Sequence, residues 1–137
     1  MDIRVLRKGD ADRVAAASHL FDGPAKMTAT QRFLDQPGHH LLVAYEGEHQ
    51  AGFVSGVEMT HPDKGTEMFL YELAVEEGLR RGGIGRALVE RLASIAHERG
   101  CYGMWVVTEE ENVAALATYS HSGGEAETGQ VVFVWTF

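Results

Sequence analysis

Apolar and polar residues alternate in short runs through the first half of the chain. Alternation bounded by turn-forming residues predicts half-buried strands. It is found in three runs, residues 3–6, 40–45 and 51–59. Glu46-Gly47-Glu48 lies between the last two runs and predicts a turn, so we expect these two strands to form a hairpin. Two short helices are expected before the hairpin, over residues 11–20 and 30–35, with Asp10 as the N-cap of the first.

The second half of the chain alternates strand patterns with helix patterns. Strands are expected over residues 68–75, 102–107 and 131–137. Apolar residues at helical spacing indicate a helix from Ile84, and Gly100 is placed to end it with a left-handed cap. A further helix is expected over residues 112–120, closed by Gly123. This order predicts an α/β fold with parallel strands where a helix crosses over, in a single domain of residues 1–137 because no linker or repeat divides the chain.

The net charge of the chain limits the kinds of molecule that it is expected to bind. The 137 residues include 12 Lys+Arg and 20 Asp+Glu, for a formal charge of −8. Proteins that bind nucleic acid without sequence preference neutralise phosphates with an excess of Lys and Arg, so the acidic balance argues against nucleic acid and favours cationic partners. The start of the chain shows no secretory signal, and its apolar runs fall short of the roughly 20 residues that span a bilayer. We therefore expect a cytoplasmic protein without a membrane partner.

Cysteine and histidine usage predicts no metal site. The single cysteine, Cys101, excludes an internal disulfide and a thiolate zinc site, and it follows the expected cap glycine, where packing is favoured over an acyl-cysteine role. His39, His40 and His61 lack the spaced partners of a zinc motif, and neighbouring side chains on a strand point to opposite faces. Their roles, including a place at the rim of an acceptor cleft, stay open at this point.

The most informative segment is residues 79–88, Leu-Arg-Arg-Gly-Gly-Ile-Gly-Arg-Ala-Leu, between the most strand-like run and the longest helix. A glycine turn at a helix N-terminus presents free backbone N–H groups and the positive end of the helix dipole to an anion. Arg80, Arg81 and Arg86 add positive charge, and a charge-assisted hydrogen bond contributes about 1.5–3 kcal/mol against about 0.3–1 from the dipole. An ordinary strand-to-helix turn with solvated arginines fits the same spacing.

Two nucleotide-binding motifs do not fit this segment. A dinucleotide fingerprint requires a third glycine, and Leu88 stands in its place. A P-loop requires Lys followed by Ser or Thr after its last glycine, and Arg86-Ala87 follows Gly85.

Two short motifs resemble one family. Arg80-x-x-Gly83-x-Gly85 resembles the Arg/Gln-x-x-Gly-x-Gly/Ala signature of the GNAT superfamily, the acyl-CoA-dependent N-acetyltransferases. The run from Asn112 through Ala115 to Tyr119, followed by a glycine, resembles that family's Asn-x-x-Ala-x-x-x-Tyr helix, and the order of elements agrees over residues 3–137. The resemblance implies a GNAT fold, a mixed central sheet of about six to seven strands flanked by about four helices. Two departures are Gly124, where an aromatic residue is common, and Glu77, where proline is common.

The resemblance also implies a co-substrate, acetyl-CoA, and the residues that hold it. The backbone of Leu73, Ala74 and Val75 would pair with the pantetheine arm, and Arg80 would lie beside the pyrophosphate. The N–H groups that would hold the pyrophosphate belong to Arg81, Gly82, Gly83, Ile84, Gly85 and Arg86. Asn112 would bond the pantetheine or the surroundings of the thioester, and Tyr119 would protonate the departing thiolate.

The strand before the glycine turn suggests a branch of the family. Tyr71-Glu72-Leu73-Ala74-Val75 resembles the Tyr-Asp-Leu-Ala-Val strand of the aminoglycoside 3-N-acetyltransferases. This implies a small cationic amine as acceptor and a role in antibiotic resistance. Tyr71, Glu72, Glu109 and Glu110 are the expected substrate-binding residues, and dimers are frequent in this family. A polyamine, a small amine or a peptide N-terminus are alternative acceptors, and a non-catalytic acetyl-CoA-binding module is a third possibility.

The chemistry of amine acetylation assigns roles to two side chains. An alkylammonium group cannot attack a thioester, so a base must accept its proton directly or through water, and Glu72 is the best candidate. In the alternative reading Glu72 is a strand carboxylate that faces water or pairs with an arginine. Tyr119 is the expected acid, whereas on periodicity alone it is a packed aromatic residue, and Asn112 alone is a helix N-cap.

Overall fold

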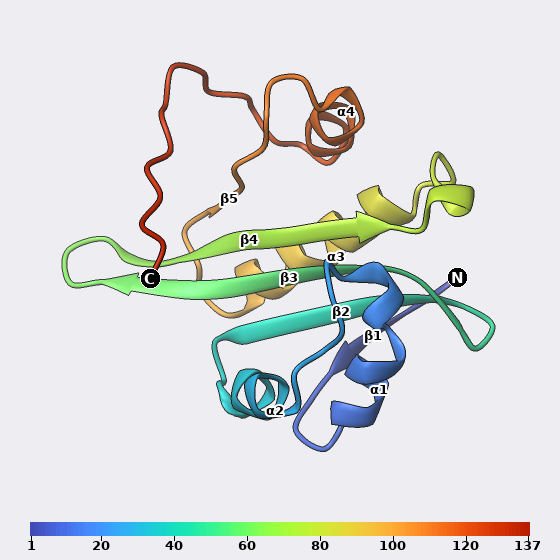
Figure 1. The fold of residues 1–137 in the computed structure, drawn as a ribbon. Helices are drawn as coiled ribbons and strands as arrows, with labels where there is room; N and C mark the ends of the chain where they lie inside the picture. The colour runs from blue at the N-terminus through green and yellow to red at the C-terminus, as the bar shows by residue number, and fades with distance from the viewer.

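A computed structural model describes residues 1–137 as a five-stranded mixed sheet (Figure 1). The strands are β1 (Asp2–Leu6), β2 (His39–Glu46), β3 (His49–His61), β4 (Gly65–Val75) and β5 (Met104–Trp105), and they lie in this order across the sheet. β1 to β4 pair antiparallel and β4 pairs parallel with β5. The α/β class and the 40–59 hairpin expected from the sequence are confirmed.

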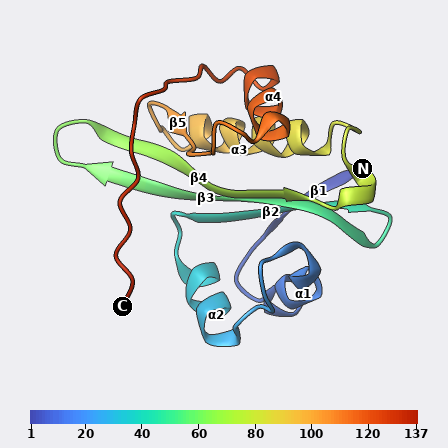
Figure 2. The ribbon, with the colours of Figure 1, turned by 45° about the horizontal axis from the view of Figure 1, so that its top comes forward.

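Helices cover both faces of the sheet (Figure 2). On one face lie α1 (Ala11–Ala16), the short 3-10 turn η1 (Ser18–Leu20) and α2 (Met27–Asp35). On the other face lie α3 (Ile84–Glu98) and α4 (Val113–His121), and a second 3-10 turn, η2 (Glu77–Leu79), joins β4 to α3. The four α-helices agree with the expected number. None of them combines the length and the apolar character needed to cross a bilayer.

Two apolar clusters fill the two faces. The larger has twelve buried residues and joins the sheet to α3, with Leu42, Met68 and Leu88 almost completely buried. The smaller has six, including Val14 and Phe53, and faces α1 and α2. The sheet is therefore buried from both sides, which fixes the face on which each strand residue lies.

The helix ends follow the sequence signals in part. α1 ends at Ala16, short of the expected residue 20, and α2 begins at Met27, three residues before the expected start. At the end of α3, Gly100 has a φ of 82°, and Cys101 N–H donates to the Ala96 carbonyl at 2.9 Å, as in a Schellman cap. Asp10 does precede α1, but its carboxylate accepts from the Arg7 amide at 2.7 Å and makes no cap bond to the helix. The expected side-chain cap is therefore wrong, because the strand-to-helix turn uses this carboxylate instead.

The count of six to seven strands is also wrong. β5 holds only two of the residues expected over 102–107, and residues 131–137 form no strand. This last segment runs away from α4 as an extended tail (Figures 1 and 2). Its apolar side chains are exposed, among them Phe133 at 77% and Trp135 at 75%. A strand needs a neighbour as well as β-forming residues, and within this chain the tail has none.

Candidate active site

A β-bulge in β4 turns two consecutive side chains to the same face. Ser55 of β3 pairs with Glu72, and the next residue, Gly56, pairs with Leu70, so Tyr71 is an extra residue without a partner. Leu70 and Leu73, on either side of the bulge, both pack in the cluster under α3. Tyr71 and Glu72 consequently both line a pocket on the α1/α2 face.

That pocket has a volume of about 400 Å³ and mostly apolar walls. Its wall residues come from α1, α2, the loop between them, and strands β2 to β4: Val14, Phe21, Gly23, Pro24, Ala25, Lys26, Ala29, Thr30, Phe33, Leu41, Phe53, Ser55, Tyr71 and Glu72. Phe21 meets Phe53 edge to face at 4.8 Å between centroids, which makes part of the wall rigid. Glu72 is the one carboxylate in the lining. The wall therefore combines apolar surface with one acidic side chain, Glu72, and one basic side chain, Lys26.

The surroundings of Glu72 suit a proton acceptor. Its backbone N–H donates to Ser55 Oγ at 3.2 Å, which fixes the strand at this point. Burial raises the pKa of the Glu72 carboxyl, and the negative charge of Asp22 raises it further. A raised pKa brings a carboxylate closer to the value that favours proton transfer near neutral pH. Asp22, in the loop after η1, was not singled out from the sequence, because nothing in its local pattern connects it with a strand fifty residues away.

The other edge of β4 is open beside this pocket. β5 pairs with β4 only at Met68 and Phe69, so the edge from Leu70 to Val75 has no strand partner on that side. An open edge presents backbone N–H and C=O groups to an extended ligand. The structure places Leu73, Ala74 and Val75 on this edge, where a chain of amide groups such as pantetheine fits.

The glycine turn after β4 has the geometry of an anion site. Gly83 has a φ of 85° and precedes α3, and Arg81 has a φ of 68°, which is rare for a residue with a side chain. Outside the helix and strand ladders, the amide N–H groups of residues 81–86 donate no backbone hydrogen bond. Strained backbone and free N–H groups at a helix N-terminus are the features that hold phosphate groups.

The arginines of the turn have different partners. Arg80 Nε donates to the Val75 carbonyl at 3.1 Å and so ties the turn to the end of β4. Arg86 Nε donates to Glu90 Oε1 at 2.7 Å along the exposed side of α3. Arg81 is exposed. Of the three arginines, Arg86 is therefore the one whose charge is paired with a carboxylate.

α4 holds the other two predicted residues. Asn112 Oδ1 accepts from Ala115 N–H at 3.0 Å, which confirms that Asn112 is the N-cap. Tyr119 is half-buried against the cluster under α3, and burial raises the pKa of its hydroxyl. Glu72 lines the pocket on the α1/α2 face and Tyr119 packs against the cluster under α3, so the two side chains lie on opposite faces of the sheet.

A family model now decides the assignment. The model of the acetyltransferase (GNAT) family matches residues 12–123, which include the bulged strand, the glycine turn and α4. The chain belongs to the GNAT family.

Three similar proteins illustrate the range of this family. The ribosomal protein bS18-alanine N-acetyltransferase of Escherichia coli (strain K12) is 37% identical over 57 residues, 42% of this chain but only 38% of that enzyme. The aminoglycoside acetyltransferase meta-AAC0020 from an uncultured soil metagenomic sample, solved with sisomicin, has a TM-score of 0.90 at 21% identity and covers 99% of this chain and 95% of its own. AAC(6')-Iy with the bisubstrate analog CoA-S-monomethyl-acetylneamine has a TM-score of 0.83 at 20% identity, covering 99% and 97%. At these identities the two structures establish the GNAT fold.

The remaining predicted residues of this GNAT chain lie elsewhere. Glu109 and Glu110 are exposed in the loop before α4 and are not part of the pocket wall. Their role in substrate binding stays a prediction. Cys101 packs half-buried against the cluster under α3, and burial raises the pKa of its thiol.

The three histidines considered from the sequence also have individual places. His40 Nε2 lies 2.7 Å from Glu58 Oε2, and Arg99 pairs with the same carboxylate. The His39 ring packs 5.1 Å from that of Phe33, and His61 pairs with the nearby carboxylate of Asp63. None of the three lines the pocket that contains Glu72.

Proposed function

We propose that this chain transfers an acetyl group from acetyl-CoA to a primary amine. The observation that supports this most directly is the bulge, which turns Glu72 into a pocket at the point where the β4 edge opens. The amine would enter from the α1/α2 face. The coenzyme would approach along the open edge of β4, on the side of the glycine turn and α4.

Acetyl-CoA fits the backbone groups of this region. The open edge from Leu73 to Val75 matches the amides of pantetheine, and the free N–H groups of residues 81–86 match a pyrophosphate. Bound there, the coenzyme would supply an acetyl thioester. The Arg80 guanidinium, anchored on the Val75 carbonyl, would face the phosphates with its remaining N–H groups. Asn112 would keep its amide nitrogen for the pantetheine while its oxygen caps α4.

Glu72 and Tyr119 would move protons on opposite sides of the sheet. Glu72 would accept the proton of the ammonium group, directly or through water, so that the neutral amine can attack. Tyr119 would donate its hydroxyl proton to the departing thiolate. A tyrosine hydroxyl is protonated at neutral pH, and because burial raises the pKa of Tyr119, its proton remains available for the thiolate. The two residues would thus act on different atoms, Glu72 on the amine nitrogen and Tyr119 on the thioester sulfur.

The favoured acceptor is an aminoglycoside, acetylated at its 3-amino group, which would give antibiotic resistance in the cytoplasm. The Glu72 carboxylate in the pocket wall, with the negative charge of Asp22 acting on it, supports a cationic acceptor. Two structurally similar acetyltransferases were solved with sisomicin and with a CoA–acetylneamine bisubstrate analog. Glu109 and Glu110 would add negative potential outside the pocket.

A peptide N-terminus is the second candidate. The pocket wall contains three phenylalanines and several aliphatic residues, which fit an amino-terminal residue with an apolar side chain better than a sugar ring. A curated relative that acetylates an alanine of a ribosomal protein belongs to the same family. Polyamines and other small amines share the charge of aminoglycosides without their rings. A non-catalytic acetyl-CoA-binding module would require neither Glu72 nor Tyr119.

One assay distinguishes these acceptors. Thiol release from acetyl-CoA is measured with aminoglycosides, polyamines, small amines and peptides, and mass spectrometry locates the acetyl group. Turnover with aminoglycosides and acetylation at the 3-amino group is the expected result. Activity confined to peptides would show that the acceptor is a peptide N-terminus, and acetyl transfer would still stand. The absence of both turnover and acetyl-CoA binding would contradict the proposed acetyl transfer.

We also propose that the protein is a homodimer, in which each tail pairs with the other copy. Residues 131–137 are rich in β-branched and aromatic residues, remain exposed, and are long enough for a strand of roughly 23 Å. β5 has an edge without a partner; Trp105 within it is 41% exposed, and Val107 just after it is 55% exposed. Reciprocal exchange of such a segment is a common route to closed dimers.

Light scattering coupled to size-exclusion chromatography tests the dimer. The unmodified chain should elute with twice its monomer mass of 15.0 kDa. Replacing Phe133 and Trp135 by aspartate should give monomers, and Val113→Asp, at an exposed position on α4, is the matched control. A monomeric unmodified chain, or a double variant that stays dimeric, would exclude tail exchange.

A further inference from the structure

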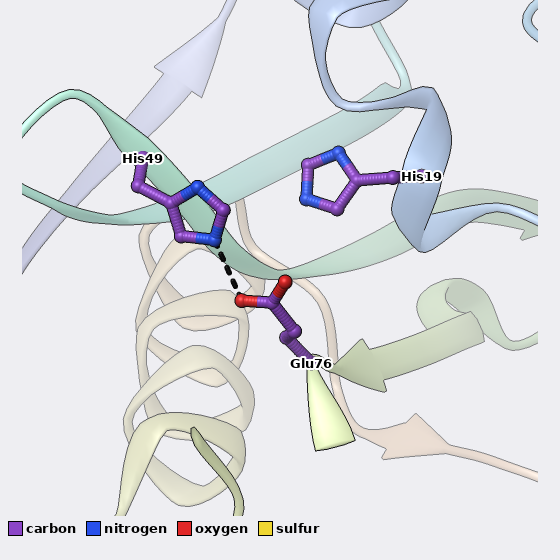
Figure 3. A group of neighbouring side chains, drawn as sticks. All are labelled: His19, His49 and Glu76. Carbon is purple, nitrogen blue, oxygen red and sulfur yellow. Dashed lines mark hydrogen bonds and ion pairs between the residues drawn. The ribbon is translucent and has the colours of Figure 1, made fainter. Parts of the chain in front are cut away.

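Two histidines and a glutamate from three separate elements converge at the end of the sheet. His19 lies in η1, His49 is the first residue of β3, and Glu76 follows β4 directly (Figure 3). One ligand atom from each lies within 4.8 Å of the other two. His49 Nε2 is 2.6 Å from Glu76 Oε2, and the rings of His19 and His49 stack at 5.5 Å between centroids. This cluster is separate from the acceptor pocket, whose wall includes none of the three.

Backbone contacts hold His49 and Glu76, and a ring contact holds His19. His49 pairs with Glu46 at the β2–β3 turn, which sets where its side chain leaves the sheet. The Glu76 N–H donates to the Ala51 carbonyl at 2.9 Å. The His19 ring lies with Nε2 3.0 Å from the Gln50 carbonyl. All three residues are therefore anchored against the same stretch of β3, so their convergence follows from the register of the sheet.

We propose that His19, His49 and Glu76 bind a zinc ion. Two imidazole nitrogens and one carboxylate oxygen form a donor set that Zn²⁺ uses with a solvent molecule as fourth ligand. Ligand atoms around a tetrahedral zinc lie roughly 3.3 Å apart, given metal–ligand distances near 2.0–2.2 Å. In the structure the three atoms are at most 4.8 Å apart, so small side-chain rotations bring them to one ion.

The solvent-facing position of the cluster suggests an exchangeable ion. His19 and His49 are exposed and Glu76 is half-buried, which leaves the fourth coordination position open to water. The ion would connect η1, the start of β3 and the end of β4. Glu76 is followed at once by η2 and the glycine turn, so the ion would fasten the segment from which that turn begins.

Titration calorimetry with zinc chloride tests the site on the full, untagged chain in a buffer that does not bind metals. We expect one zinc per chain with a dissociation constant in the micromolar range or tighter, and a rise in melting temperature on zinc addition. Cobalt(II) in place of zinc should give the visible absorption of a tetrahedral ion. Acetyl-CoA is absent from these measurements, so their outcome does not depend on the proposed acetyl transfer.

Single substitutions assign the ligands. His19→Gln leaves the His49–Glu76 pair in place and should still weaken zinc binding at least tenfold, as should His49→Gln and Glu76→Gln. His97→Gln, at an exposed position of α3 outside the cluster, should bind zinc as the unmodified chain does. Melting curves without zinc show whether each variant folds, and His19→Gln alone is sufficient if the other two do not.

Three results would overturn the site. These are an absence of zinc binding by the unmodified chain, binding that His19→Gln leaves unchanged, and binding that is lost in His61→Gln. The last would move the ion to the His61–Asp63 pair. A crystal grown with zinc tests the site directly. An anomalous peak among the three side chains would support it, and the absence of a peak there would contradict it.

Discussion

Ser55 and Glu72 face each other across β3 and β4, and the Ser55 hydroxyl accepts the N–H of Glu72 at 3.2 Å. This contact lies immediately beside the bulged residue Tyr71 and stabilises an irregular point in the sheet. The contact holds the backbone of Glu72, whose side chain lines the pocket. The first predictions concern this carboxylate.

Glu72→Gln should reduce kcat by about 10²–10⁴, the usual contribution of a positioned base. The amide has nearly the same shape but cannot accept the ammonium proton. Binding of acetyl-CoA, measured by calorimetry, should remain within about twofold of the unmodified chain because the glycine turn is untouched. Glu98→Gln, on the exposed end of α3, is the control. Turnover of Glu72→Gln near that of the control would exclude Glu72 as the base.

Asp22→Asn should move the acidic limb of the pH–rate profile to lower pH. Glu72 acts only when ionised, so kcat/KM falls as the pH drops through its pKa. Burial and then the charge of Asp22 raise that pKa, so removing the charge lowers it and extends activity toward acid. Asp22→Glu retains the charge and should retain the profile. If both variants follow the unmodified profile, the limb does not report Glu72.

Tyr119→Phe should lower kcat about 10²-fold if the hydroxyl protonates the thiolate. The loss should shrink with an acetyl thioester whose thiol has a low pKa, since such a thiolate leaves without a proton. Packing alone would not produce this dependence on the leaving group. Tyr102→Phe, an exposed tyrosine before β5, is the control. An equal loss with both thioesters would assign Tyr119 to structure.

Gly83→Ala should weaken acetyl-CoA binding about tenfold. A side chain at a φ of 85° costs roughly 1–2 kcal/mol, which favours rotating this turn out of its anion-binding geometry. Gly103→Ala is the matched control, because Gly103 has no positive φ and open space around its Cα. Calorimetry gives both affinities, and equal values would show that the turn does not bind the coenzyme.

Glu58→Gln should destabilise the fold by about 1.5–3 kcal/mol, since a partly buried carboxylate loses charged hydrogen bonds to His40 and Arg99. Burial by itself would raise the pKa of Glu58, but these two bonds outweigh it and the pKa is lowered. A carboxyl with a lowered pKa in the folded state stabilises above its unfolded pKa, and this stabilisation is lost as the pH falls through the folded value. Melting temperatures should therefore fall less steeply in acid for the variant. Parallel curves would assign the acid sensitivity to other groups.

The sequence predicted the elements whose signals are local. α3 begins at Ile84 as its apolar spacing predicts, and Gly100 ends it in a left-handed conformation. Asn112 could be assigned as an N-cap because a cap depends on residues within one turn. The hairpin was predictable for the same reason, because its turn lies between two alternating runs.

The features that could not be predicted from the sequence depend on contacts between residues far apart in the chain. Residues 131–137 have the composition of a strand, but composition carries no information about a free edge beside them. Asp22 affects Glu72 only because the loop after η1 lies beside β4. The convergence of His19, His49 and Glu76 depends on the register of β2, β3 and β4, and the spacings of 30 and 27 residues match no metal motif.

The bulge at Tyr71 divides β4 into residues that pack in the core and residues that line the pocket. Upstream of it Met68 and Leu70 belong to the core under α3, and downstream Leu73 and Val75 pack there, while Tyr71 and Glu72 belong to neither cluster. Mutations at Tyr71 can therefore reshape the acceptor cavity while the packing that keeps the domain folded is preserved. Substitutions at Tyr71 should consequently leave the melting temperature nearly unchanged.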